Sequence, residues 1–208
     1  MKTQAEPKIH IVGLNGSPNK NGNTMVLLEE ALAAASELGA TTEILHCTDS
    51  LRGVKNPFCI NCESPCSGKC YAGKPLEEAY QILSQADGLL IGSPVYFGTV
   101  SGQLKAFWDK SRNMRTRKLF YNIIGGAVTS GASSYGGQET TIRAIHDMMM
   151  VQGMIVVGDG YIENDCGHLG AMATRPAAED QNARARARIL GKRLAEVARA
   201  TGNIRVGR

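Results

Sequence analysis

The sequence predicts one α/β domain, a doubly wound parallel sheet of five strands in the order 2-1-3-4-5 with helices on both faces. Short apolar runs alternate with longer amphipathic runs, which is typical of strand–helix units. The strand segments scarcely alternate between apolar and polar residues, as expected for strands buried on both faces. A length of 208 residues suits a single domain, which we expect to span residues 1–208.

The first half of the chain supplies three expected strands and two expected helices. Gly39 should end the first helix, and Pro75 stands at a favourable first helical position. The expected elements are a strand over Ile9–Leu14, a helix over Thr24–Leu38, a strand over Thr42–Cys47, a helix over Pro75–Gln85 and a strand over Asp87–Ser93.

The second half continues the alternation. Leu104, Phe107 and Trp108 share one side of the first helix there, which we expect to face the core. The expected elements are a helix over Ser101–Asn113, a strand over Asn122–Thr129, a helix over Gln138–Gln152, a strand over Met154–Val157 and a helix over Ala177–Ala200.

The net charge of +4 comes from the C-terminal helix. Residues 181–208 hold eight Lys and Arg residues against Glu196 alone, so the remainder of the chain is net negative. These basic residues lack interleaved aromatics, and we therefore expect no nucleic-acid partner. No run approaches the roughly 18 apolar residues of a membrane span, and the first residues lack the apolar stretch of a secretory signal. We expect a cytoplasmic protein with no membrane partner.

The loop after the first strand has the composition of an anion site. Helix N-terminal amides together with short polar side chains bind phosphate oxygens well. Neither G-x-G-x-x-G nor a loop ending in GK[ST] is present, so a single terminal phosphate is favoured over a dinucleotide or a triphosphate. The alternative is a turn in which Asn23 or Thr24 simply caps the following helix. The candidate phosphate ligands are Ser17, Asn19, Asn23 and Thr24.

The loops after the third and fourth strands converge on the same edge of the predicted sheet. The first, Ser93–Gly98, carries a rigid proline and two aromatic residues. The second, Thr129–Glu139, carries glycines that let backbone approach a flat ligand closely. Since ligands of such sheets bind beyond the carboxyl ends of the strands, the three loops predict a site for a flat ring on a phosphorylated tail.

Three segments together resemble the NAD(P)H-dependent FMN reductase and quinone reductase group of flavodoxin-like proteins: GSPNKNGNT (16–24), GSPVYFGTVSGQLKAFWDK (92–110) and GGQETT (136–141). The resemblance implies bound FMN, NAD(P)H as electron donor, a quinone or a flavin as small-molecule acceptor, and a homodimer or homotetramer. It assigns the phosphate to Ser17, Asn19, Asn23 and Thr24, the isoalloxazine and its N5 edge to Pro94, Val95, Tyr96 and Phe97, and the other rim to Ser130, Gly131 and Gly136.

Four of the six cysteines lie within twelve residues, in a cysteine-rich insertion at about 55–74. In a cytosolic chain such cysteines are reduced thiols or metal ligands. The compact run is nearer to [4Fe–4S] ligation than to a zinc site, while unligated or redox-active thiols are the third interpretation. The spacing C-x₂-C-x₃-C-x₃-C also resembles the motif of the iron–sulfur flavoproteins, whose second gap is commonly shorter and third gap longer. The candidate ligands are Cys59, Cys62, Cys66 and Cys70.

The sequence contains no pattern for a catalytic acid, base or nucleophile, and we assign no catalytic residue. This agrees with flavin chemistry, in which the cofactor performs the reaction and the protein binds and orients it. The expected function is transfer of electrons from NAD(P)H through FMN to an acceptor. The alternative is an iron–sulfur flavoprotein that carries electrons to or from ferredoxin.

Overall fold

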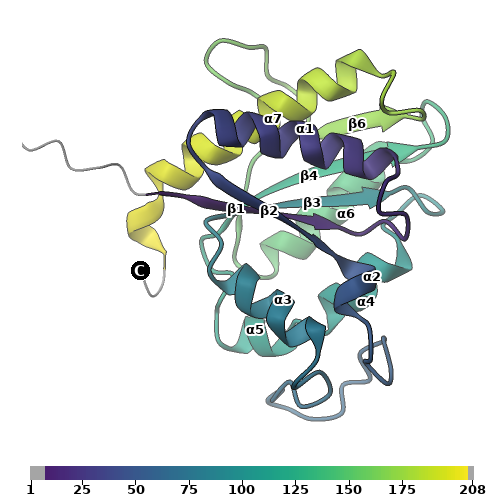
Figure 1. Cartoon of the computed structure of the whole chain (residues 1–208), viewed down its shortest axis with the longest axis vertical. Coiled ribbons are helices and arrows are strands. Elements are labelled where there is room, and N and C mark those ends of the chain that lie inside the picture. Colours follow the sequence, from purple (N-terminus) through teal and green to yellow (C-terminus); the bar gives the residue numbers. More distant parts are fainter. Residues whose placement is uncertain (1–7, 206–208) are drawn as a thin grey trace, which may run out of the picture.

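A computed structural model describes residues 8–205 of the chain. A parallel sheet with the strand order β2-β1-β3-β4-β5 forms its centre, and β6 also pairs with β4 (Figure 1). The strands are β1 (His10–Asn15), β2 (Thr41–His46), β3 (Gly88–Pro94), β4 (Ile124–Gly131), β5 (Ile155–Val156) and β6 (Ala171–Thr174). The predicted fold class and strand order are confirmed.

Helices cover both faces of this sheet. The helices are α1 (Asn23–Glu37), α2 (Cys47–Ser50), α3 (Pro75–Ser84), α4 (Gly102–Asp109), α5 (Arg112–Thr116), α6 (Gln138–Met150), α7 (Gln181–Ala200) and the 3₁₀ turn η1 (Gly202–Ile204). Figure 1 shows α1 and α7 on one face and α3 to α6 on the other. In the part of the chain that the structure describes, no helix is long and apolar enough to cross a membrane.

Two apolar cores result, one for each face of the sheet. Leu27, Leu28, Ala31, Leu190 and Leu194 pack α1 and α7 against the strands. The larger core on the opposite face contains side chains from α3, α4 and α6. Central strands β3 and β4 are buried along nearly their whole length. The sheet is therefore held rigidly, and the loops at its carboxyl edge start from fixed positions.

Most expected elements differ from the structure by one or two residues at their ends, and three of the differences have a clear local cause. The second strand stops at His46, because Cys47 begins the short helix α2. The expected helix over 101–113 is divided into α4 and α5 at Lys110–Ser111. Ser111 turns its hydroxyl back to the carbonyl oxygen of Trp108 (2.7 Å), a local bond that competes with helix continuation. The last helix begins at Gln181 rather than at Ala177, after a cap by Asp180.

The outer edge of β4 carries two short strands where the sequence predicts one. β5 has only two residues and pairs with the start of β4, while β6 pairs with residues 128–131 at its end. Residues 157–170 leave the sheet between them, with Gly160 and Gly167 at positive φ. β6 escapes sequence analysis because its four residues, Ala171–Thr174, contain no β-branched run.

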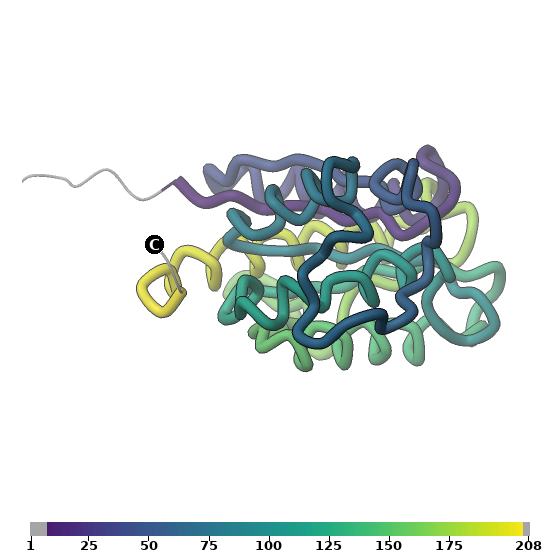
Figure 2. The backbone as a smooth tube through the Cα atoms, turned by 90° about the horizontal axis from the view of Figure 1, so that it is seen from below, coloured from purple at the N-terminus to yellow at the C-terminus, as the bar shows by residue number. Residues whose placement is uncertain are grey.

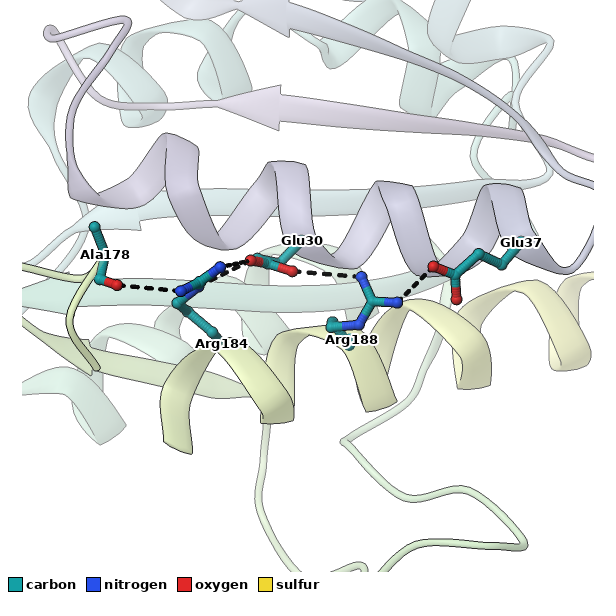
Figure 3. Close-up of polar contacts among 5 residues, drawn as sticks. All are labelled: Glu30, Glu37, Ala178, Arg184 and Arg188. Carbon is teal, nitrogen blue, oxygen red and sulfur yellow. Dashed lines mark hydrogen bonds and ion pairs between the residues drawn. The ribbon is translucent and has the colours of Figure 1, made fainter. Parts of the chain in front are cut away.

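The basic helix α7 pairs with α1 rather than facing solvent alone. Arg184 donates to Glu30 Oε1 through Nε and Nη2 at 2.8 and 2.5 Å, and to the carbonyl oxygen of Ala178 at 3.2 Å (Figure 3). Arg188 bridges Glu30 at 3.4 Å and Glu37 at 2.5 Å (Figure 3). Two of the arginines of α7 are thereby paired with acidic residues of α1.

Replacing Glu30 by Gln tests this network. The hydrogen bond from Arg184 is the largest cause that lowers the pKa of Glu30 in the folded protein. The ionised Glu30 therefore stabilises the fold at pH values above its unfolded-state pKa. This stabilisation is lost as the pH falls through the lowered folded-state pKa. Because the arginines are partly exposed, we expect a loss of about 0.5–1 kcal/mol at pH 7 in urea unfolding. The difference from wild type should vanish in acid. Glu29→Gln, on an exposed residue outside the network, is the control; an equal loss there would contradict the assignment.

Candidate functional site

Hydrogen bonds join the three predicted cofactor loops at the carboxyl edge of the sheet. Ser101 at the N-terminus of α4 donates to the carbonyl oxygen of Gly16 (2.5 Å). The hydroxyls of Thr24 and Ser130 lie 3.1 Å apart. Thr140 of α6 donates to the carbonyl oxygen of Gly98 (2.7 Å). The structure therefore brings together segments that are more than 100 residues apart in sequence.

The first loop is shaped by successive side chain–backbone bonds. Asn15 Oδ1 accepts the Ser17 amide (2.9 Å), Ser17 Oγ accepts the Asn19 amide (3.1 Å), and Asn19 Oδ1 accepts the Asn21 amide (3.0 Å). Ser17 and Thr24 are buried, whereas Asn19 is exposed. These bonds curl the backbone into a tight loop before α1.

The start of α1 tests the capping interpretation of that loop. The N-cap residue is Gly22, and no side chain caps the helix. Asn23 Oδ1 instead accepts the amide of Ala177 (2.8 Å), and Lys20 pairs with Asp49. The alternative in which Asn23 or Thr24 serves as the cap is wrong, and an N-terminus without a side-chain cap retains amides suited to an anion.

The second loop is a tight turn after β3. Tyr96 and Thr99 pair through both backbone amides, and Val95 donates to the carbonyl oxygen of Ser130 (2.9 Å). Phe97 lies at the tip with φ of 50° and a fully exposed ring, and Tyr96 is also exposed. Pro94 and Val95 are half-buried at the base. An apolar ring held out on a strained backbone is available to a ligand or to another chain.

The third loop follows β4 and lies against the second. Ser130 and Gly131 are buried at the end of β4, directly before the loop, and Gly136 within the loop is exposed. A Cβ on Gly137 would lie 3.0 Å from the Cα of Gly98, so glycine permits this close approach. Tyr135, next to a cavity of about 520 Å³ that Met172 and Thr174 also line, has an exposed ring.

The four clustered cysteines lie in a separate loop between α2 and α3, which crosses the near side of the molecule in Figure 2. All four are free thiols and line one cavity of about 600 Å³. Phe58 and Ile60, both exposed, form part of its apolar wall. Within residues 8–205, no three His, Cys, Asp or Glu side chains are arranged to hold a metal ion.

Two basic residues at the junction of α4 and α5 line the same cavity. Lys110 is buried, and its Nζ lies 3.7 Å from Cys70 Sγ. Arg112 donates to the carbonyl oxygen of Glu63 (3.3 Å), and Asn113 donates to that of Cys66 (2.7 Å). Burial, then the nearby Cys66 and Cys70, raises the pKa of Tyr71 to about 12. The Lys110 amino group lies directly beside the cysteine-lined cavity.

Sequence reasoning missed three polar residues that organise these sites. Asn15 shapes the phosphate loop, Ser101 ties that loop to α4, and Lys110 faces the cysteines. Asn15 had a usable signal, since it is a polar residue that directly follows a buried apolar strand. The role of Lys110 depends on a contact across 40 residues and has no local signal.

Comparison with known proteins places the chain in a family. Residues 9–168 match the family model of the NADPH-dependent FMN reductases. An iron–sulfur flavoprotein of Methanocaldococcus jannaschii is 43% identical over 190 residues, covering 90% of this chain and 96% of the relative. An NAD(P)H dehydrogenase (quinone) of Chromohalobacter salexigens is 40% identical over 80 residues, covering 38% of this chain and 40% of the relative.

A solved structure supports the same fold. The WrbA-like flavodoxin protein from Agrobacterium tumefaciens superposes with a TM-score of 0.66 at 22% identity, covering 93% of this chain and 99% of that one. The strand order, the three joined loops and the sequence match agree with one another. The chain belongs to the NADPH-dependent FMN reductase family of flavodoxin-like oxidoreductases.

Proposed function

We propose that this protein is an oxidoreductase that takes electrons from NAD(P)H and passes them through FMN to a small acceptor such as a quinone or a flavin. The main support is that the Thr24–Ser130 and Thr140–Gly98 hydrogen bonds hold the three loops together at the carboxyl edge of the sheet. Membership of the family supports FMN as the cofactor.

The residues at this edge suit FMN in their chemistry. Short hydroxyl and amide side chains, together with the N-terminus of α1, suit a phosphate, and Ser17, Asn19, Asn23 and Thr24 would hold it. Pro94, Val95, Tyr96 and Phe97 would line one side of the ring system. Ser130, Gly131 and Gly136 would line the opposite rim, where small residues leave room for a flat ligand.

The chain's part in the reaction is to bind and orient. When bound, FMN accepts a hydride from a nicotinamide and gives the two electrons onward. The aromatic side chains of Tyr96 and Phe97 would stack against rings and exclude water, and the loop amides would hold the cofactor in one register. No side chain of this chain is assigned a proton-transfer role.

Association of copies would complete this edge. Phe97 and Tyr135 each expose an entire aromatic ring on adjoining loops, and exposed aromatic groups of this kind favour a partner surface. We therefore infer a homodimer or homotetramer with these loops at its interface. Light scattering of the purified protein gives the oligomeric state.

Anaerobic mixing of the FMN-loaded chain with NADH or NADPH tests the donor. The proposal predicts bleaching of the flavin absorption near 450 nm and its return when a quinone is added. Flavin that stays oxidised with both nicotinamides would contradict the proposal. Reduction by a one-electron protein donor in that case would favour the second candidate.

The second candidate is an iron–sulfur flavoprotein that exchanges electrons with ferredoxin. Its specific support is the common cavity of Cys59, Cys62, Cys66 and Cys70, with buried Lys110 beside Cys70. The side chains in residues 8–205 are not arranged to hold a single metal ion, but four soft sulfur donors suit in their chemistry a [4Fe–4S] cluster, which separates its ligand sulfurs more widely than one zinc ion does. The Methanocaldococcus jannaschii relative, which matches this chain over 96% of its own length, is named an iron–sulfur flavoprotein, and this supports the interpretation.

Replacing Cys66 by Ser tests the cluster. If the four cysteines hold it, protein purified without oxygen should contain roughly four iron atoms and four acid-labile sulfides per chain. The variant should lose most of the iron while keeping its flavin. Cys166→Ser, which removes an exposed thiol outside this cavity, should keep both. Wild-type protein that remains free of iron after reconstitution with iron and sulfide would contradict the ligand set.

A further inference from the structure

His46 is linked to the phosphate loop by two successive hydrogen bonds. The parallel register of β1 and β2 places Asn15 beside His46 at the carboxyl edge of both strands. Asn15 Nδ2 lies 3.2 Å from His46 Nδ1, while Asn15 Oδ1 accepts the Ser17 amide at 2.9 Å. Asn15 is completely buried, so its amide group has no water to replace either partner.

These bonds require one protonation state of the imidazole. The Ser17 amide can only donate, and therefore Asn15 must turn its carbonyl oxygen toward Ser17 and its NH₂ toward His46. An NH₂ group also only donates, so His46 Nδ1 has to accept. Nδ1 accepts only in the neutral ring with its proton on Nε2.

We propose that neutral His46 is a positioning residue for FMN binding, holding Asn15 in the orientation that shapes the phosphate loop, and that protonation of His46 weakens FMN binding. A proton on Nδ1 would face the Asn15 NH₂ group, donor against donor. Turning the amide over would relieve this contact but would then present NH₂ to the Ser17 amide. The first arrangement leaves the Asn15 NH₂ group only the weak acceptor Met25 Sδ (4.0 Å). The second leaves the buried Ser17 amide without its acceptor, so in both the loop loses part of its anchor. The inference rests on the proposed FMN site.

The charged groups facing His46 set the pH range of this effect. Burial is the largest cause that lowers the pKa of His46, Lys20 of the phosphate loop lowers it further, and Asp49 of α2 opposes both. Asp49 itself pairs with Lys20 and with Arg52 (2.9 Å), and the pKa of its carboxyl is lowered, so its charge persists in mild acid. The ring is therefore neutral near pH 7 and takes up its proton below the ordinary range of histidine.

The test compares FMN affinity with pH in the wild type and in His46→Gln. The glutamine Oε1 supplies an acceptor that does not titrate in this range. Dissociation of FMN from the loaded full-length chain on dilution, followed by flavin fluorescence, gives the dissociation constant at pH 7.5 and pH 5.5. Because the FMN phosphate titrates near pH 6, the two proteins are compared at each pH rather than across pH.

We expect similar affinities at pH 7.5 and weaker binding by the wild type than by His46→Gln at pH 5.5, by up to about tenfold, the limit set by losing one buried hydrogen bond. Riboflavin, which lacks the phosphate, should not distinguish the two proteins. Equal affinities at both pH values, or tighter wild-type binding in acid, overturn the inference alone. A wild type that binds no FMN at any pH overturns the proposed function and this inference together.

A second measurement does not depend on how well the variant folds. Nitrogen-15 chemical shifts of the imidazole in the wild-type protein report which ring nitrogen carries the proton. The inference predicts a neutral ring at pH 7.5 with its proton on Nε2 and an accepting Nδ1. A proton on Nδ1 at that pH would contradict it.

Discussion

Replacing Ser17 by Asp is expected to weaken FMN binding at least 100-fold. Ser17 is buried inside the loop assigned to the phosphate, and its Oγ accepts the Asn19 amide (3.1 Å). An aspartate oxygen can accept the same bond, so the loop should keep its shape. Two unit charges 4 Å apart near a protein surface interact by about 4 kcal/mol, and a phosphate carries up to two, so repulsion dominates.

Two comparisons isolate this electrostatic effect. Asn21→Asp puts the same charge on an exposed side chain of the same loop and should change the affinity by less than about threefold, because water and salt screen it. Riboflavin should bind Ser17→Asp nearly as well as it binds the wild type. If a folded Ser17→Asp variant bound FMN with unchanged affinity, the assignment of the phosphate to this loop would be wrong.

Replacing Gly191 by Ala is expected to lower the free energy of unfolding by about 3 kcal/mol, at the upper end of overpacking effects. A Cβ on Gly191 of α7 would overlap the carbonyl oxygen of Ala31 in α1, and helix backbone cannot rotate away as a side chain can. The gain of about 1 kcal/mol in helix propensity from Gly to Ala is too small to compensate. The Tm should fall by roughly 6–12 °C.

Gly202→Ala provides the matched control. A Cβ at Gly202 meets nothing within 4 Å, and its φ is outside the range that favours glycine. The same change there should alter the free energy of unfolding by less than about 0.5 kcal/mol. Equal urea midpoints for Gly191→Ala and wild type would show that α1 and α7 separate easily, contrary to their close packing.

Most of the fold could be predicted from sequence because its signals are local. Buried strands such as β3 and β4 read as apolar runs, and alternation with amphipathic helices determines a parallel sheet. The predictions fail where the chain interrupts a helix or strand locally. The Ser111 hydroxyl bonds to the backbone at the break between α4 and α5, and residues 157–170 leave the sheet between β5 and β6. Periodicity does not report such interruptions.

The candidate site divides in the same way. Composition predicts the phosphate-loop residues, and the family resemblance predicts those that line the ring system. The structure brings the loops that carry them together through Thr24 and Ser130. Their individual contacts with FMN stay predictions. Asn15, His46 and Lys110 act across 31 to 40 residues of sequence, and only the packed structure reveals these partners. Side-chain orientation at a sheet edge depends on strand register, which composition does not specify.

Protein purified without oxygen should show flavin absorption peaks near 375 and 450 nm, and the flavin released by denaturation should be FMN, at about one per chain. A colourless protein that takes up no added FMN would contradict the account.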